Sequence, residues 1–510
     1  MSLGNAGFAR RSSRPQGGDE YNAATRGLSI QQGTQNATAW VDPYPSPSGR
    51  ERTCTMTTAH DHTPTTFMRS VSVSDFRCFG DEQTARLAPL TLFVGDNSTG
   101  KSSLMALIGV LWEAHFSRYP QPAFNREFFD LGGFRDMVHF RGGRGGRRTS
   151  FTARVVLGGE LGKSHGLEAT VTFREKDGYP EAQSYVYTEN GLSIKVCNES
   201  KRVTLMYQEA DGPPSPVHDF GQSEFMPRVD GPLLHPLLWS IGNRDHTDGS
   251  ERQQRLRDAI FAISSKIDSI SQEFQSGEFG FAFMAPLRAQ PKRIYLLGTS
   301  MADSGAYNLP SQLITTKHTD PSLWGRLKGS IETFGKRLGL FSQFDVIAVA
   351  NGKGIGPFEM RVRGNPNQPR QVGPWRNLVD VGYGVSQILP LICRLSDPSV
   401  HLHLIQQPEI HLHPKAQAAL GSFLCEWIAE GKGQLIIETH SQYLLDRVRM
   451  EVRDSRIDIE PTDVSVAFFE SHGLESRITN IGFDDLGNVR GAPPGYDSFF
   501  VDEVVRSIGL

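Results

Sequence analysis

The feature that most constrains this chain is a glycine-rich stretch at residues 95–103, which reads Gly-Asp-Asn-Ser-Thr-Gly-Lys-Ser-Ser. It fits the phosphate-binding P-loop pattern G-x-x-x-x-G-K-[ST]. The apolar run at 90–94 predicts a buried strand before it, and the apolar spacing from Ser102 to Trp112 predicts a helix after it. A strand, loop and helix in this order are the context in which the pattern binds a triphosphate. The chain is therefore predicted to bind ATP or GTP.

Each residue type in this loop has a chemical reason. Gly95 and Gly100 permit backbone angles that let successive N–H groups point at a triphosphate. The N-terminus of the following helix adds positive potential. Lys101 is predicted to reach the β- and γ-phosphates, and Ser102 to ligate Mg²⁺. The predicted nucleotide-binding residues of the loop are Gly95, Asp96, Asn97, Ser98, Thr99, Gly100, Lys101, Ser102 and Ser103.

Composition narrows the class of protein further. The chain has 510 residues, of which 38% are hydrophobic and 21% charged, as in a globular protein with more than one core. The net charge of −3 argues neither for nor against nucleic-acid binding, which would need a local basic patch. The scattered cysteines form no C-x-x-C pair and no zinc-ligand spacing, which favours a reducing cytoplasm. No apolar run approaches about 18 residues, so we expect no transmembrane helix.

The pattern along the chain predicts four parts. Residues 1–66 are rich in small and polar residues and are expected to form a disordered tail, with Met56 or Met68 as an alternative start of the protein. The N-terminal ATPase lobe with the P-loop spans 67–150. An inserted β-hairpin and helical region spans 151–282, and the C-terminal ATPase lobe spans 283–510.

Within the inserted region, alternating runs between Phe151 and Tyr207 predict antiparallel strands, with a hairpin turn at Asn190-Gly191. Apolar spacing predicts amphipathic helices over 251–276 and 322–341. Strand and helix signals then alternate through 380–470, which predicts parallel β/α architecture. The expected fold is an α/β P-loop NTPase with a mixed sheet.

Three C-terminal motifs fit a nucleotide site. A glycine-rich turn at 380–390 carries Ser386 at the start of an apolar helix, where it binds a phosphate or simply caps the helix. A buried strand at 400–405 ends where a Mg²⁺-binding acid belongs. A third apolar strand ends at His440, which either contacts the γ-phosphate or is structural. His411 and His413 lack a third metal ligand nearby, so a structural role is expected for both.

The order of these motifs, together with Pro286-Leu-Arg288, resembles prokaryotic AAA-type ATPases related to RecF and to the OLD (overcoming lysogenization defect) ATPases, within the ABC-ATPase heads that include SMC proteins. The resemblance covers residues 68–510. It implies a homodimer that sandwiches two ATP molecules, with the P-loop of one copy facing Ser386 of the other and His440 as the switch histidine. It also implies a role in DNA repair or anti-phage defence beside a separate nuclease or toxin.

The chain departs from this family at the strand that normally ends in one or two carboxylates. Both positions are amides, Gln406 and Gln407, and the nearest acid is Glu409. An amide cannot take up a proton or bind Mg²⁺ as a carboxylate does. Three interpretations stay open: Glu409 serves the metal or the water, the site hydrolyses slowly, or the chain senses ATP without hydrolysing it. Gln407, Glu409 and His440 are the catalytic candidates, with Ser102 and Gln406 as the metal candidates.

Two further expectations concern less specific signals. The stretch 131–138 lies where a Q-loop belongs, yet it offers Asp136 in place of glutamine. A basic tract could contact DNA phosphates, although a solvated loop is the favoured explanation; its arginines are Arg141, Arg144, Arg147 and Arg148.

An OLD-type nuclease would need a C-terminal Toprim domain. Only about 70 residues follow His440, which is too few for a domain. The acids Asp484, Asp485 and Asp502 in this stretch are therefore expected to be surface residues.

Overall fold

The computed structural model describes residues 67–496, with gaps at 117–121, 127, 144–145, 159–165, 200–201, 210–214, most of 222–280, 287–289, 297–308, 350–355, 365–372 and 398–399. The predicted tail at 1–66 and the last residues, 497–510, lie outside the described residues. The four-part division of the chain stays a prediction.

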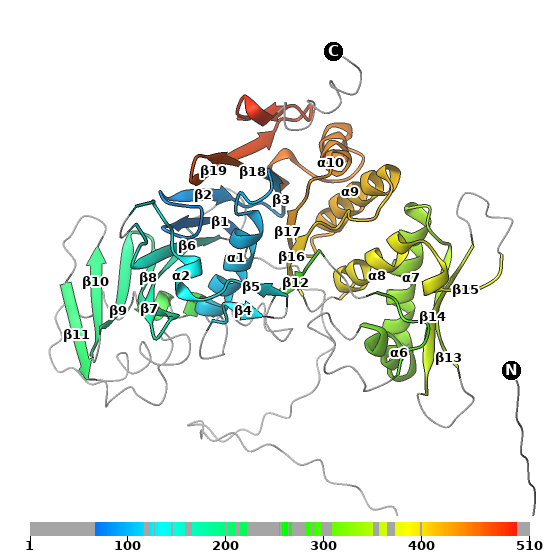
Figure 1. Cartoon of the computed structure of the whole chain (residues 1–510), viewed down its shortest axis with the longest axis horizontal. Helices are drawn as coiled ribbons and strands as arrows, with labels where there is room; N and C mark the ends of the chain where they lie inside the picture. Colours follow the sequence, from blue (N-terminus) through cyan, green and yellow to red (C-terminus); the bar gives the residue numbers. More distant parts are fainter. Residues whose placement is uncertain are drawn as a thin grey trace, which may run out of the picture. The chain divides into compact units, whose positions relative to one another are not determined.

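A central sheet carries the P-loop strand in its middle (Figure 1). Its order is β12 (Ala282–Met284), β16 (Leu402–Gln406), β17 (Gln434–Glu438), β3 (Leu90–Gly95), β18 (Val464–His472), β19 (Glu475–Phe483) and β20 (Val489–Arg490). The strands from β12 to β18 are parallel, and the last two run antiparallel. The predicted parallel β/α architecture is confirmed, and the mixed sheet with it.

Helix α1 (Lys101–Phe116) lies against one face of this sheet and is buried on nearly all sides, in keeping with the apolar run from Leu104 to Trp112. Its other side packs on a second, antiparallel sheet through one shared core. That sheet has the order β11 (Ser215–Gly221), β10 (Arg202–Glu209), β9 (Leu192–Glu199), β8 (Tyr179–Glu189), β7 (Leu167–Lys176), β6 (Ser150–Gly158), β1 (Phe67–Ser74) and β2 (Gln83–Arg86).

The predicted strands of this region are confirmed, and so is the hairpin between β8 and β9. Asn190 and Gly191 both have positive φ, 51° and 80°, as the tight hairpin turn requires. Of the helix predicted over 251–276, the described residues between 254 and 267 are helical, and Ile260 and Ile263 enter the shared core. The rest of that prediction lies outside the described residues.

The opposite face of the central sheet packs in one core with α9 (Pro414–Ala429) and α10 (Gln442–Asp454), and α8 (Tyr383–Leu395) joins this core. The same core includes α6 (Leu309–Thr319), α7 (Pro321–Arg337) and a small sheet, β13 (Gln343–Ala348), β14 (Phe358–Arg363) and β15 (Arg376–Asn377). The helix predicted at 322–341 is thus confirmed as α7. The remaining short elements are β4 (Asn125–Arg126), β5 (Phe129–Asp130), α2 (Phe134–Met137), the 3-10 turn η1 (Leu378–Asp380) and η2 (Pro461–Asp463).

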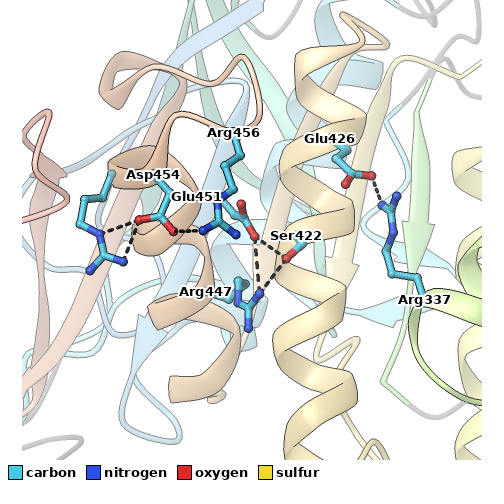
Figure 2. A network of polar contacts seen from close by, with 8 residues as sticks. Arg337, Ser422, Glu426, Arg447, Glu451, Asp454 and Arg456 are labelled. Carbon is cyan, nitrogen blue, oxygen red and sulfur yellow. Dashed lines mark hydrogen bonds and ion pairs between the residues drawn. The ribbon is translucent and has the colours of Figure 1, made fainter. Parts of the chain in front are cut away.

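Polar contacts hold α9 against its neighbours (Figure 2). The Ser422 hydroxyl on α9 donates to the buried Glu451 carboxylate on α10 at 2.6 Å, and Arg447 lies 3.7 Å from the same carboxylate. Arg337 at the end of α7 pairs with Glu426 on the other side of α9. These contacts join the second half of α9 to α10 and to the end of α7, and so hold the three helices against one another.

Candidate nucleotide-binding site

Helices leave neighbouring strands of the central sheet toward opposite faces at one point. After β3 the chain enters α1 on one face, and after β17 it enters α10 on the other. In open α/β sheets, ligands bind outside the carboxyl ends of the strands at such a switch point. The P-loop lies here, between the ends of β3 and β17.

The P-loop glycines are required by close packing. Gly95 has φ 135°, and a Cβ there would lie 2.1 Å from the Phe469 carbonyl oxygen on β18. Gly100 has φ 91°, and a Cβ there would lie 2.5 Å from Cys78 Sγ. Ser98 also takes a positive φ of 64°. No side chain larger than hydrogen fits at the two glycines, so the loop conformation depends on both.

Lys101 begins α1 with its side chain buried under the loop. Its ammonium donates to the Gly95 carbonyl at 2.9 Å and to the Asp96 carbonyl. Burial lowers the pKa of Lys101, and the nearby Glu438 and Asp96 carboxylates oppose that shift. The loop carbonyls hold the buried ammonium of Lys101 in place. Because this cation is shielded from water, its attraction to an anion is strong, and it is suited to bind a phosphate.

Ser102, the next residue, meets a carboxylate from the neighbouring strand. Its hydroxyl oxygen lies 2.9 Å and 2.7 Å from the two carboxylate oxygens of Glu438 at the end of β17. Burial raises the pKa of Glu438, while hydrogen bonds from Ser102 and Gln406 and the charge of Lys101 lower it. Sequence reasoning missed Glu438, although the signal was present as an acid ending an otherwise apolar strand.

The end of β16 carries the amides noted in the sequence. Gln406 is buried and lies opposite Glu438 in the register of the two strands. Gln407 has a positive φ of 42°, and its N–H donates to the Glu438 carbonyl at 2.7 Å. The amides and the carboxylate of Glu438 are therefore neighbours at one edge.

Glu409 contacts the backbone of the neighbouring strand end, and its catalytic role stays a prediction. It is buried, and its carboxylate accepts the backbone N–H of His440 at 2.8 Å. His440 itself is half-buried, and burial together with the charge of Lys101 lowers its pKa while Asp96 raises it. The structure thus brings His440 into the field of the P-loop residues, with Glu409 holding its backbone.

The glycine-rich turn at 380–390 lies against the loop that follows β16. Gly382 is the N-cap of α8, so Ser386 lies in the helix's first turn and is not its cap. A Cβ at Gly384 would lie 2.8 Å from the His411 carbonyl oxygen. At the start of the turn, Arg293 donates to the Asp380 carboxylate at 2.9 Å.

The two histidines of the loop after β16 have local roles. His413 caps α9, with its ring accepting the N–H of Lys415 at 3.3 Å, and His411 has a positive φ of 68°. Among the described residues, no group of three or more His, Cys, Asp or Glu side chains is placed to hold a metal ion on its own.

At the Q-loop position, Asp136 accepts the Gly133 N–H at 3.0 Å and so caps α2. Arg77, in the hairpin between β1 and β2, donates to Ser103 Oγ at 2.6 Å and to the Leu131 carbonyl at 3.0 Å. No sequence motif marked Arg77, which fastens the start of α1 to the 131–138 segment.

The basic tract is largely engaged within the protein. Arg141 lies 3.4 Å from Asp81, Arg148 lies 2.8 Å from Asp75, and Arg147 donates to the Arg135 carbonyl. All three side chains are exposed, and Arg144 lies outside the described residues. Contact with DNA therefore stays a prediction, and it would have to compete with these internal partners.

Comparison with known proteins adds a family match in the C-terminal half. Residues 329–446 match a family model described as "AAA domain, putative AbiEii toxin, Type IV TA system". This segment contains the turn at 380–390 and the ends of β16 and β17, and it does not include the P-loop. No curated protein sequence matches the chain.

Solved structures similar to this chain include SMC heads. The head bound to the C-terminal winged-helix domain of ScpA is 11% identical over 82% of this chain and 98% of that one, with TM-score 0.38. The head domain from Thermotoga maritima is 12% identical over 81% and 97%, with TM-score 0.37. The Pyrococcus furiosus head with an extended coiled coil, bound to the C-terminal domain of ScpA, is 9% identical over 86% and 100%, with TM-score 0.39.

The P-loop at the switch point of a mixed α/β sheet and the AAA-domain match over residues 329–446 show a P-loop NTPase fold, as the motif order predicted. Membership of the ABC-ATPase heads stays a prediction, and so does the narrower grouping with RecF and OLD proteins. Within the described part of the chain, no helix is long and apolar enough to cross a membrane.

Proposed function

We propose that this protein binds ATP with Mg²⁺, closes as a homodimer around it, and hydrolyses it as a molecular switch. The observation that carries the proposal is the P-loop at the switch point of the sheet, where the buried Lys101 ammonium is held by the loop carbonyls and Ser102 follows it at the start of α1. A cation and a hydroxyl in this arrangement are groups that a Mg²⁺–triphosphate needs from a protein. The P-loop N–H groups supply the remaining contacts to phosphate oxygens.

The hydroxyl of Ser102 is a hard oxygen ligand that suits Mg²⁺. When bound, this metal would supply positive charge that offsets the negative charge of the transferred phosphoryl group. Lys101 would hold the β- and γ-phosphates. The electrostatic influence of Lys101 and Asp96 on His440 supports a position near the γ-phosphate for that ring.

The dimer rests on the turn at 380–390. The N-terminus of α8 presents backbone N–H groups and partial positive charge, which suit a phosphate. We propose that this turn, with Ser386, meets the nucleotide held by the P-loop of a second copy. The contact of Gly384 with the His411 carbonyl supports coupling between this turn and the edge that carries Gln407 and Glu409.

For the biological role, we propose control of a separate nucleic-acid-processing or anti-phage effector, a nuclease or a toxin, in the cytoplasm. The motif resemblance supports the separate effector, and the matched family model, described as a "putative AbiEii toxin, Type IV TA system", supports a defence context.

A nuclease in this chain has less support. The segment after α10 forms β18 to β20 of the ATPase sheet. Within it, the Asp484 carboxylate is used by a turn, where it accepts the N–H groups of Leu486 and Asn488.

A second candidate is an ATP sensor that does not hydrolyse its ligand. The amides at Gln406 and Gln407 favour it, because neither can act as a general base. Phosphate release by the purified chain separates the two candidates, since a sensor dimerises on ATP and releases none.

The test of ATP binding itself is Lys101→Ala beside Lys336→Ala, an exposed lysine on α7. Losing a charge partner of a phosphate costs about 2–5 kcal/mol, so ATP affinity is expected to fall roughly 30-fold to 4,000-fold. The Lys336 variant should bind ATP as the parent does. Equal affinity of the Lys101 variant and the parent would contradict the proposed function.

A further inference from the structure

We infer that Glu438, at the end of β17, is the Mg²⁺-ligating carboxylate of this site, replacing the acid that the end of β16 lacks. This inference rests on the proposed function and names the residue that completes its metal site. It moves the metal ligand one strand along the sheet, from Gln406 to the residue opposite it in register.

The first argument is the geometry of Glu438 with Ser102. The Ser102 hydroxyl oxygen lies 2.7 Å and 2.9 Å from the two carboxylate oxygens. Adjacent ligands of an octahedral Mg²⁺ with bonds of 2.0–2.1 Å lie about 2.9 Å apart. The two side chains therefore already have the separation of neighbouring ligands of one ion.

The second argument is the environment of the carboxylate. Glu438 is 4% exposed, and it lies among Ser102, Gln406 and the charge of Lys101. A buried carboxylate is costly unless cations or hydrogen-bond donors compensate it. When a triphosphate engages Lys101, that cation is shared with the phosphates, and a divalent ion beside Glu438 restores the balance of charge.

The third argument concerns the neighbouring residues. Gln406 hydrogen bonds to the Glu438 carboxylate, so its amide orients the acid across the strand pair. An acid at position 406 would stand opposite Glu438 as a second buried negative charge and repel it. Glu409 uses its carboxylate on the His440 N–H. The edge thus holds one carboxylate facing Ser102, which is sufficient for Mg²⁺ bound mainly by phosphates and water.

The experiment measures how strongly Mg²⁺ strengthens binding of a fluorescent ATP analogue, as the ratio of Kd in EDTA to Kd in excess MgCl₂. Glu438→Gln keeps the size of the side chain and removes its charge. We expect this ratio to fall at least about tenfold, the range seen when the surroundings of a metal ligand are altered. Affinity without Mg²⁺ should stay equal or increase, because a negative charge near the triphosphate is gone. Bound Mn²⁺, counted by electron paramagnetic resonance, should fall in parallel.

Matched variants make the result specific. Glu409→Gln should leave the ratio unchanged, and the double variant Gln406→Glu with Glu438→Gln should recover it. If Glu438→Gln folds poorly, Glu438→Asp is the milder substitution. It is expected to lower the ratio by a smaller factor.

If the Glu438→Gln variant keeps the parent's ratio of Kd in EDTA to Kd in MgCl₂, the inference is overturned, even if turnover is lost. A fall of this ratio in Glu409→Gln overturns it as well. If the parent protein binds no ATP analogue with or without Mg²⁺, the proposed function falls as well. The two failures are therefore distinguishable in one titration series.

Discussion

The ends of β16 and β17 differ in a way that the usual order of motifs would not suggest. Both strands are buried and parallel, and Gln406 and Glu438 lie opposite each other in register. The strand expected to carry the acid ends in amides, and its neighbour carries the carboxylate that reaches the P-loop through Ser102. A metal ion needs a carboxylate at the carboxyl edge of the central sheet, and a residue at the end of either β16 or β17 can provide one.

The two ends also support each other. The acid of the β16 loop, Glu409, accepts the N–H of His440 beyond β17, and the N–H of Gln407 donates to the Glu438 carbonyl. Each strand end therefore fixes the backbone of the other. The comparison can be tested by substitutions that act on one end and are read out at the other.

The largest effect on stability is expected for Glu409→Ala. The partly buried N–H of His440 would lose its acceptor, which costs about 1–3 kcal/mol of the free energy of unfolding. Glu409→Gln keeps an acceptor oxygen and should lose much less. Urea denaturation of both variants measures the difference. Equal losses would show that the hydrogen bond across the two strand ends is not what Glu409 contributes.

A second prediction concerns pH and Glu438. Because burial raises the pKa of this carboxyl in the folded protein, the unfolded chain ionises first as pH rises. The stability that the neutral carboxyl contributes is present below the ordinary carboxyl pKa and is lost as pH rises through the raised value. Without nucleotide, Glu438→Gln should therefore have a higher Tm than the parent at neutral pH, with the difference vanishing at acidic pH. Thermal unfolding across this range checks it, and a Tm difference that grows on acidification would contradict it.

Gln406→Glu tests the register pair directly. It places a second carboxylate opposite Glu438, and like charges in this arrangement destabilise a strand pair by about 1 kcal/mol. The loss of stability should shrink at acidic pH, where the two carboxyls titrate as a coupled pair. Denaturation at neutral and acidic pH, without Mg²⁺, measures it. Unchanged stability at neutral pH would mean that the two strand ends do not share one electrostatic environment.

Features formed by residues close together in the sequence could be predicted, and features formed by residues far apart in the sequence could not. The P-loop is a contiguous backbone motif, so residues 95–103 were sufficient to predict a triphosphate site. The hairpin at Asn190-Gly191 is local in the same sense. Glu438 contacts Ser102, which lies 336 positions away in the chain. Arg77, in the hairpin between β1 and β2, contacts Ser103 in the first turn of α1. Such contacts depend on strand order and register, which no local pattern specifies.

Gln407 is a predicted catalytic side chain and also has a backbone role at the end of β16. Two substitutions separate these roles, and their expected effects on stability are the smallest of the four predictions. Gln407 has φ 42°, a conformation that costs a residue with a Cβ about 1–2 kcal/mol and costs glycine little. Gln407→Gly removes that strain but adds freedom to the unfolded chain worth about 0.5–1 kcal/mol, so its stability should stay near that of the parent. Gln407→Ala keeps the strain and should be the less stable of the two. If the side chain acts on the nucleotide, both variants lose turnover equally. If only the strained backbone matters, through its N–H to the Glu438 carbonyl, turnover follows the order of stability instead, with the alanine variant losing more.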